Sequence, residues 1–252
     1  MSYKWALGLL ASVGMLSMLG ASSLGATLYL NDVSPSANMT VTFPGLSAET
    51  TPYVGHINWT FDRGNSDNAT LDTLVQGSSL TTFCIEGTQN VYIHENSTFS
   101  SILTGVIGAP KDHVGSVYAM DATDAATLSM FWDAHYSQSL LSNTDAAAFQ
   151  LGMWEIVYDG GTSPNFTAGN FKASAVAGDT TSAAALAEAQ SWLSGLPNVT
   201  PTEHYQLYVL SDRCLQDQVF GVNAVPLPAA LPAGLSLLAG LGVFRRYRKR
   251  PS

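Results

Sequence analysis

The order of hydrophobic patterns along the chain is the feature that most restricts its fold. Apolar and polar residues alternate between positions 27 and 61, most clearly at 39–43 and 56–61, and this period of two predicts strands. Further strands are expected at 80–86, 90–94, 205–210 and 218–222, and helical spacing is found at 121–141, 144–157 and 182–193. Strands followed by helices and then by strands predict an α+β domain.

The N-terminal residues have the composition of a secretory signal. Lys4 provides a positive charge, residues 5–19 form a short apolar stretch, and small residues follow up to Ala26. We therefore expect residues 1–26 to be a signal peptide that is removed near Ala26. The alternative is a retained membrane helix, for which the apolar stretch is short.

The C-terminal residues, 223–252, combine a Pro-containing linker, an apolar run to Phe244 and a basic end. This order resembles the PEP-CTERM sorting signal of Gram-negative bacteria that produce exopolysaccharide, in its Val-Pro-Leu-Pro-Ala variant, with Leu227 in place of the glutamate. The resemblance implies an exosortase-type peptidase as a processing partner and a location at the cell envelope, at the cell surface or in the extracellular matrix. A plain C-terminal membrane anchor is the alternative. The residues that carry the resemblance are Val225, Pro226, Leu227, Pro228, Arg245 and Arg246.

The central region, residues 27–222, is strongly acidic. It holds all 19 acidic residues of the chain but only Arg63, Lys111, Lys172 and Arg213 as basic residues, which gives a formal net charge of −15. Such a surface repels nucleic acids, so we expect no nucleic-acid partner. It also favours a cationic partner group such as a lysine amine.

The chain contains two cysteines, Cys84 and Cys214. In a secreted protein this number favours one disulfide bond, and closing a loop of this length would stabilise the fold by about 4–5 kcal/mol in the chain-entropy model. A Cys84–Cys214 disulfide is therefore one of two interpretations of Cys84.

The residues around Cys84 and Gln150 support the other interpretation. Cys84 and Glu86 share one face of a β-prone segment. Gln150 and Trp154 are four residues apart on the expected helix 144–157 and are therefore neighbours on its surface. In this helix Phe149, Met153 and Val157 form the expected buried stripe, Asn143 or Thr144 is the expected N-cap, and the glycines at 160 and 161 are expected to end the helix.

The two segments Phe83-Cys84-Ile85-Glu86 and Phe149-Gln150-Leu151-Gly152-Met153-Trp154 resemble the paired motifs of bacterial surface thioester domains. The resemblance covers roughly residues 82–159. It implies a β-rich, sandwich- or barrel-like part with an inserted helical part. It also implies a thioester between Cys84 and Gln150 that an amine or hydroxyl of an extracellular target can attack. In this interpretation Phe83, Met153 and Trp154 exclude water, and Glu86 orients the site or assists proton transfer.

Motifs of conventional catalysis are not found. The histidines lack the spacing of a zinc site, the aspartates lack that of an EF-hand, and neither a Gly-x-Ser-x-Gly nor a phosphate-binding loop occurs. We therefore expect no metal, no cofactor and no turnover. Two alternatives to the covalent tether stay open: a structural matrix protein with the disulfide, and a glycan-processing enzyme, which would need a pair of carboxylates in a cleft.

Overall fold

The computed structural model describes residues 25–111, 119–161, 163–200 and 204–224. The expected signal peptide and the sorting-signal residues, from Val225 to Arg246, lie outside the described residues. Within the described part of the chain, no helix is both long enough and apolar enough to span a membrane.

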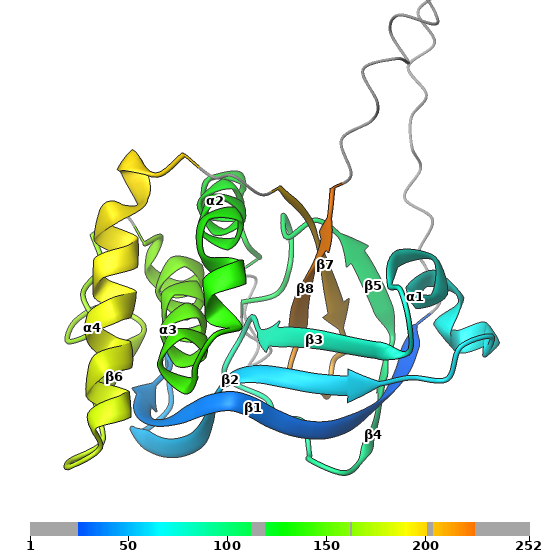
Figure 1. The fold of residues 1–252 in the computed structure, drawn as a ribbon, viewed down its shortest axis with the longest axis horizontal. Coiled ribbons are helices and arrows are strands. Elements are labelled where there is room, and N and C mark those ends of the chain that lie inside the picture. Colours follow the sequence, from blue (N-terminus) through cyan, green and yellow to red (C-terminus); the bar gives the residue numbers. More distant parts are fainter. Residues whose placement is uncertain (1–24, 112–118, 162, 201–203, 225–252) are drawn as a thin grey trace, which may run out of the picture.

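The strands form one antiparallel sheet in the order β4-β1-β2-β3-β8-β7-β5, and β6 pairs with the far end of β1. The bounds are β1 (Ala26–Thr42), β2 (Glu49–Thr60), β3 (Ser79–Cys84), β4 (Asn96–Phe99), β5 (Ser101–Thr104), β6 (Lys172–Ala175), β7 (Tyr205–Ser211) and β8 (Gln218–Asn223). The outermost strands of this order, β4 and β5, are separated in the chain by Ser100 alone, so the sheet must curl back on itself. In Figure 1, β1 and β2 cross below the upright strands β5, β7 and β8.

The helices are α1 (Ala69–Leu74), α2 (Ala122–Ser139), α3 (Asn143–Asp159) and α4 (Thr180–Gly195), with 3-10 turns at Ser66–Asn68 and Leu196–Asn198. α2, α3 and α4 lie side by side at one end of the sheet (Figure 1). They are inserted between β5 and β7, so the prediction of an α+β domain with an inserted helical part is confirmed.

Helix α3 is buried on all sides. Every residue from Ala146 to Val157 is buried, including the expected stripe of Phe149, Met153 and Val157. A helix that is buried all round lies inside the hydrophobic core, whereas an amphipathic helix packs on its surface. Gly160 ends it in the left-handed conformation with φ 78°, as expected. Its N-cap is Ser142, whose hydroxyl accepts from Asp145 N, and not Asn143 or Thr144 as expected.

The predicted strand at 90–94 is wrong. The chain has no regular secondary structure at residues 90–92 and turns at Ile93 and His94, where His94 has φ 65°; the next strand begins only at Asn96. The segment reaches β1 only at its end, where His94 N donates to Leu30 O at 2.8 Å and Leu30 N donates to Glu95 O at 3.0 Å. The alternation of Val91, Tyr92 and Ile93 therefore reflects partial burial against the core and not membership of the sheet.

Candidate functional site

Cys84 is the last residue of β3, at the point where this strand leaves its partner β2. The pairing of β2 with β3 ends at Ile57 and Thr82, whereas β3 continues beside β8, with Cys84 opposite Gln218. Ile85 N donates to Asp217 O on the β8 side. Because backbone groups of successive residues point to opposite sides of a strand, the N–H and C=O of Cys84 point away from β8.

Gln150 of α3 satisfies these two backbone groups. Cys84 N donates to Gln150 Oε1 at 2.9 Å, and Gln150 Nε2 donates to Cys84 O at 2.8 Å. The Gln150 side chain is only 1% exposed. The carboxamide thus replaces the missing neighbouring strand and is fixed in one orientation beside Cys84. The structure brings together the two residues that the motifs singled out.

Two further glutamines surround the sulfur of Cys84. The thiol donates to Gln216 Oε1 at 3.0 Å, and Gln218 Nε2 lies 3.8 Å from Sγ. Gln216 is held by a bond from its Nε2 to Glu86 O at 2.9 Å, and Gln218 Oε1 accepts from Thr82 Oγ1 at 2.9 Å. The sulfur is therefore contacted by amide groups, which are neither acids nor bases.

The surroundings keep the Cys84 sulfur protonated. Burial raises the pKa of the thiol well above its usual range, and the negative charge of Glu86 raises it further. The hydrogen bond from Gln218 acts in the opposite direction. At neutral pH Cys84 is consequently a thiol and not a thiolate.

Glu86 is fully buried, two residues after Cys84. Its Oε2 accepts from the backbone N–H of Thr88 at 2.5 Å and from the Thr88 hydroxyl at 2.6 Å. These bonds fix the carboxylate, whose negative charge contributes to the raised pKa of Cys84.

Cys84 lies at the wall of a hollow of about 340 Å³, which we call the Cys84 hollow. Trp154 and Gln216 line it beside Cys84, and the exposed rings of Tyr53 and Tyr92 belong to its lining as well. Phe83 and Met153 are buried but do not line it; Phe83 packs instead against Phe149, at a centroid distance of 4.7 Å. Of the expected shielding residues, the structure thus places Trp154 at the hollow.

Trp154 is held by other aromatic rings. Its indole meets Phe43 edge-on at 5.0 Å and Phe171 at 5.6 Å, and it is 4% exposed. Its Nε1 is buried and has no hydrogen-bond partner among the described residues. Trp154 thus has a fixed position in the wall of the Cys84 hollow.

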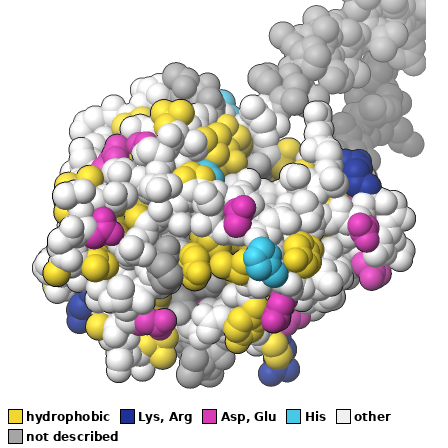
Figure 2. Space-filling model, turned by 60° about the horizontal axis from the view of Figure 1, so that its bottom comes forward, with side chains coloured by type: hydrophobic (Ala, Val, Ile, Leu, Met, Phe, Trp, Pro, Cys, Tyr) yellow, Lys and Arg dark blue, Asp and Glu magenta, His cyan; other side chains and the backbone are white. Residues whose placement is uncertain are grey.

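Figure 2 shows the molecule from below, with hydrophobic side chains exposed among acidic ones and few basic side chains. This view agrees with the acidic composition of the central region. Apart from the five tail cations and Lys4, the chain carries only four basic residues.

The disulfide alternative is not formed in the structure. Cys84 and Cys214 are both free thiols, the first buried and the second exposed. In the described residues, no group of three His, Cys, Asp or Glu side chains is arranged to hold a metal ion.

Gln216, Gln218 and the segment 87–93 were missed by the sequence analysis. The two glutamines are two residues apart, just before and at the start of β8, and this spacing is the signal that the sequence does contain. Their position at Cys84 depends on the pairing of β3 with β8, more than 130 residues apart, which no local pattern reveals.

A scan against models of known protein families and a search of curated proteins gave no match. Among solved structures, the chain is similar to the N-terminal thioester domain of a surface protein from Clostridium perfringens. The TM-score is 0.41 at 11% identity, and the match covers 79% of this chain and 99% of that domain. Because this TM-score and this identity are low, the proposed function rests on the geometry of the site and not on the similarity.

Proposed function

We propose that Cys84 and Gln150 form an intramolecular thioester, and that the protein uses it once to attach itself covalently to an extracellular target. The observation that carries this proposal is the pair of hydrogen bonds, at 2.9 and 2.8 Å, that fix the Gln150 carboxamide to the backbone of Cys84. An ordinary buried glutamine does not need a cysteine at this position, whereas thioester formation does.

The bond forms by attack of Cys84 Sγ on the amide carbon of Gln150. Negative charge develops on Gln150 Oε1, which already accepts the backbone N–H of Cys84, so this N–H stabilises the tetrahedral intermediate. The carbon–nitrogen bond then breaks, and the nitrogen leaves as ammonia with the proton of the thiol. Because the thiol is protonated at neutral pH, this proton must be removed during the reaction, and in this proposal the buried carboxylate of Glu86, two residues away in the chain, accepts it.

Attachment reverses the roles of the two side chains. An amine or hydroxyl of the target enters through the Cys84 hollow and attacks the same carbon, which becomes bonded to the target as an amide or ester. The carbon–sulfur bond breaks, and the proton of the nucleophile passes to Cys84 Sγ. The raised pKa of Cys84 makes the thiolate a slower leaving group, which protects the thioester until a well-placed nucleophile arrives.

The cellular context belongs to the same proposal. A signal peptide at residues 1–26 exports the chain across the inner membrane of a Gram-negative bacterium, and an exosortase-type peptidase recognises residues 223–252, which hold the chain at the membrane. The protein then acts at the cell surface or in the extracellular matrix as a tether that does not turn over. The order of apolar, Pro-containing and basic segments supports this part.

The intact mass of the purified protein tests the proposal. We expect a mass one ammonia below the value for the sequence, and methylamine should convert this species into an adduct that is heavier by one methylamine. The deficit should be absent in Cys84→Ala and in Gln150→Ala, and Cys214→Ser, as the matched control, should retain it. A deficit of two hydrogens that reductant abolishes would instead indicate a disulfide, and the tether mechanism would be wrong.

A further inference from the structure

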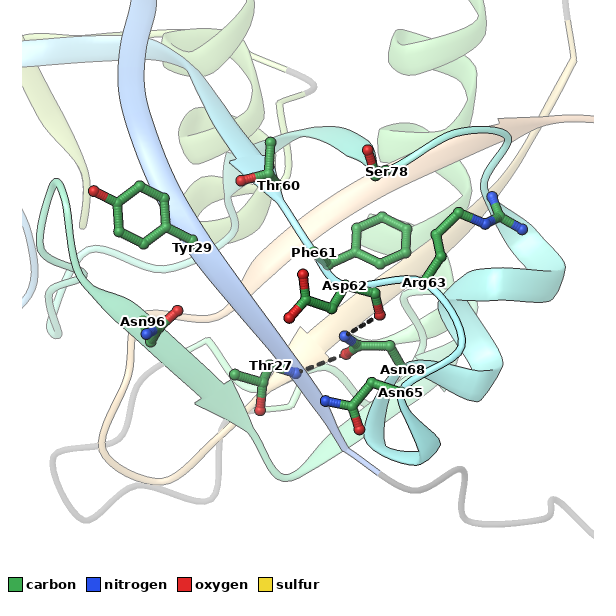
Figure 3. Close-up of a pocket in the computed structure, with 10 residues that line it drawn as sticks. All are labelled: Thr27, Tyr29, Thr60, Phe61, Asp62, Arg63, Asn65, Asn68, Ser78 and Asn96. Carbon is green, nitrogen blue, oxygen red and sulfur yellow. Dashed lines mark hydrogen bonds between the residues drawn. The ribbon is translucent and has the colours of Figure 1, made fainter.

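A second hollow lies on the other side of β1 from the core. It measures about 500 Å³ and shares no lining residue with the Cys84 hollow. We call it the Tyr29 hollow (Figure 3). Its lining consists mainly of hydroxyl, amide and carboxylate side chains with one exposed aromatic ring; the residues are Thr27, Tyr29, Thr60, Phe61, Asp62, Arg63, Asn65, Asn68, Ser78 and Asn96.

One wall of the Tyr29 hollow is a row of residues across three strands. Tyr29 of β1 is paired with Thr60 of β2 on one side and with Asn96 of β4 on the other. Paired residues of an antiparallel sheet project from the same face, so the three side chains lie next to one another. Tyr29 is 38% exposed, whereas Leu30, which points to the opposite face, is fully buried. The ring is therefore presented to solvent on a rigid support.

The opposite wall is the loop after β2, which is fixed by internal hydrogen bonds. Asn68 is 1% exposed, donates to Asp62 O at 3.1 Å and accepts from Thr27 N at 2.9 Å, so it joins the loop to β1. Gly64 N donates to the Asp72 carboxylate at 2.7 Å. Figure 3 shows Asp62 and Asn65 on this loop, across the hollow from Asn96 and Tyr29. Because the loop is already fixed, binding of a ligand does not have to order it, and this part of the entropic cost of binding is avoided.

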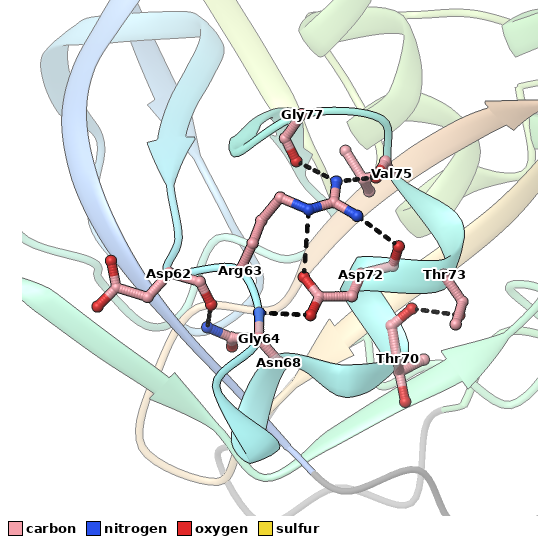
Figure 4. A network of polar contacts seen from close by, with 9 residues as sticks. All are labelled: Asp62, Arg63, Gly64, Asn68, Thr70, Asp72, Thr73, Val75 and Gly77. Atoms are coloured by element: carbon pink, nitrogen blue, oxygen red, sulfur yellow. Dashed lines mark hydrogen bonds and ion pairs between the residues drawn. The ribbon is translucent and has the colours of Figure 1, made fainter.

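Arg63, the one cationic side chain that lines the Tyr29 hollow, already has hydrogen-bond partners within the protein. Arg63 Nη1 donates to Val75 O at 3.0 Å and to Gly77 O at 2.8 Å, Nη2 donates to Asp72 O at 2.9 Å, and Nε lies 3.7 Å from the Asp72 carboxylate (Figure 4). These bonds hold the loop together and leave little donor capacity for an anion. The hollow also contains the Asp62 carboxylate, which repels anions. Phosphate and acidic ligands are thus disfavoured.

Several polar side chains of the hollow have no hydrogen-bond partner among the described residues. The carboxylate of Asp62, the amide of Asn96 and the hydroxyls of Ser78 and Tyr29 make no hydrogen bond to any other residue that the structure describes. Asp62, Asn96 and Ser78 are exposed. The set combines donors and acceptors around one aromatic face. This chemistry suits a ligand that has many hydroxyl groups and an apolar ring face, and it suits neither a lipid chain nor an anion.

We propose that the Tyr29 hollow binds a neutral saccharide. One sugar ring lies against the face of Tyr29, the Asp62 carboxylate accepts hydrogen bonds from two of its hydroxyls, and the Asn96 amide bonds to a third. The volume of about 500 Å³ lies in the range of small-molecule sites. This site is independent of the thioester, because the two hollows share no lining residue.

Saturation-transfer NMR with the purified full-length protein tests the proposal. The probes are cellobiose, maltose, lactose, mannobiose and, as the acidic comparison, digalacturonic acid. We expect transfer to the ring protons of at least one neutral disaccharide and none to digalacturonic acid. Tyr29→Ala and Asp62→Asn should each weaken binding by about tenfold or more. Leu141→Ala, which removes an exposed apolar side chain outside both hollows, is the control and should leave binding unchanged.

Thermal unfolding of each variant, together with Tyr29→Phe, separates loss of the site from loss of the fold. Tyr29→Phe keeps the ring and should retain most of the binding. The proposal is wrong if none of the neutral disaccharides shows transfer, if digalacturonic acid binds as strongly as they do, or if folded Tyr29→Ala binds as well as the unchanged protein. None of these results depends on whether the thioester forms.

Discussion

The carboxamide of Gln150 is hydrogen-bonded through both of its polar atoms to the backbone of Cys84, where a neighbouring strand would otherwise pair. The helix residue thus completes the hydrogen bonding of β3 and brings its amide carbon next to the cysteine. The contact between the Gln150 carboxamide and the Cys84 backbone therefore stabilises the fold and also positions the amide carbon for thioester formation.

Replacing Gln150 by Ala should destabilise the fold as well as prevent the thioester. The change leaves the buried N–H and C=O of Cys84 without a partner, and each orphaned group costs about 1–3 kcal/mol. We expect the free energy of unfolding, measured in urea in a Cys84→Ala background in which no thioester can form, to fall by about 2–5 kcal/mol. Gln138→Ala removes an exposed helical glutamine and should change it by less than about 0.5 kcal/mol. Equal effects of the two changes would mean that the contact with Cys84 contributes nothing to the fold.

The pKa of Cys84 should respond in opposite directions to two neighbours. In Gln150→Ala, Cys214→Ser protein, in which Cys84 is the remaining thiol, Glu86→Gln removes a negative charge and should lower the pKa. Gln218→Leu removes a hydrogen bond that favours the thiolate and should raise it. The rate of iodoacetamide alkylation as a function of pH measures both shifts. Shifts of the same sign would contradict the described surroundings of the sulfur.

Two buried histidines should make the fold sensitive to acid. Burial lowers the pKa of both His56 and His135 from 6.5 to about 4. Between these values the unfolded chain binds more protons than the folded one, so stability is complete above pH 6.5 and is lost as the pH falls towards 4. Each histidine contributes on the order of 3 kcal/mol to this loss.

Substitution of His135 tests the source of the acid sensitivity. The imidazole of His135 stacks on Trp192 at 4.5 Å, and His135→Phe keeps an aromatic ring there but removes the titrating group. Urea unfolding at a series of pH values should show a smaller loss of stability for this variant. An unchanged loss of stability in His135→Phe would show that another group is responsible.

Gly152 should resist substitution although it lies within a helix. Alanine normally stabilises a helix by about 1 kcal/mol relative to glycine. A Cβ at Gly152, however, would lie 2.3 Å from Cζ of the fully buried Phe131, and overpacking of this kind costs about 1–3 kcal/mol or more. Gly152→Ala should therefore lower the melting temperature. Gly195→Ala in α4, where a Cβ meets nothing within 4 Å, should leave it unchanged or raise it.

The local patterns of the sequence were sufficient for the three long helices, α2, α3 and α4. α3 follows from its apolar residues and from Gly160. The structure also places Gln150 at the backbone of Cys84, a pair that was singled out through the resemblance to thioester domains. α1 was not expected, because residues 69–74 are too short a segment to show a helical period. β1 runs without a break from Ala26 to Thr42, and the register shifts in its pairing with β2 account for the interrupted alternation.

The parts that could not be predicted depend on tertiary contacts. Residues 90–94 have the alternation of a strand, but the turn at His94 leaves them beside the Cys84 hollow and outside the sheet. The Tyr29 hollow exists because β2, β1 and β4 align Thr60, Tyr29 and Asn96, whose positions in the chain span 67 residues. Such alignments are fixed by strand register and not by any short motif.

Peptide mapping tests the central claim most directly. Trypsin cleaves after Arg63, Lys111 and Lys172, so Cys84 and Gln150 fall in the neighbouring peptides 64–111 and 112–172. After treatment with methylamine, we expect peptide 112–172 to carry methylamine on Gln150 and peptide 64–111 to contain a free thiol at Cys84. In untreated protein digested at mildly acidic pH, the two peptides should remain joined with the loss of one ammonia. Separate peptides with an unmodified Gln150 under both conditions would show that no thioester forms.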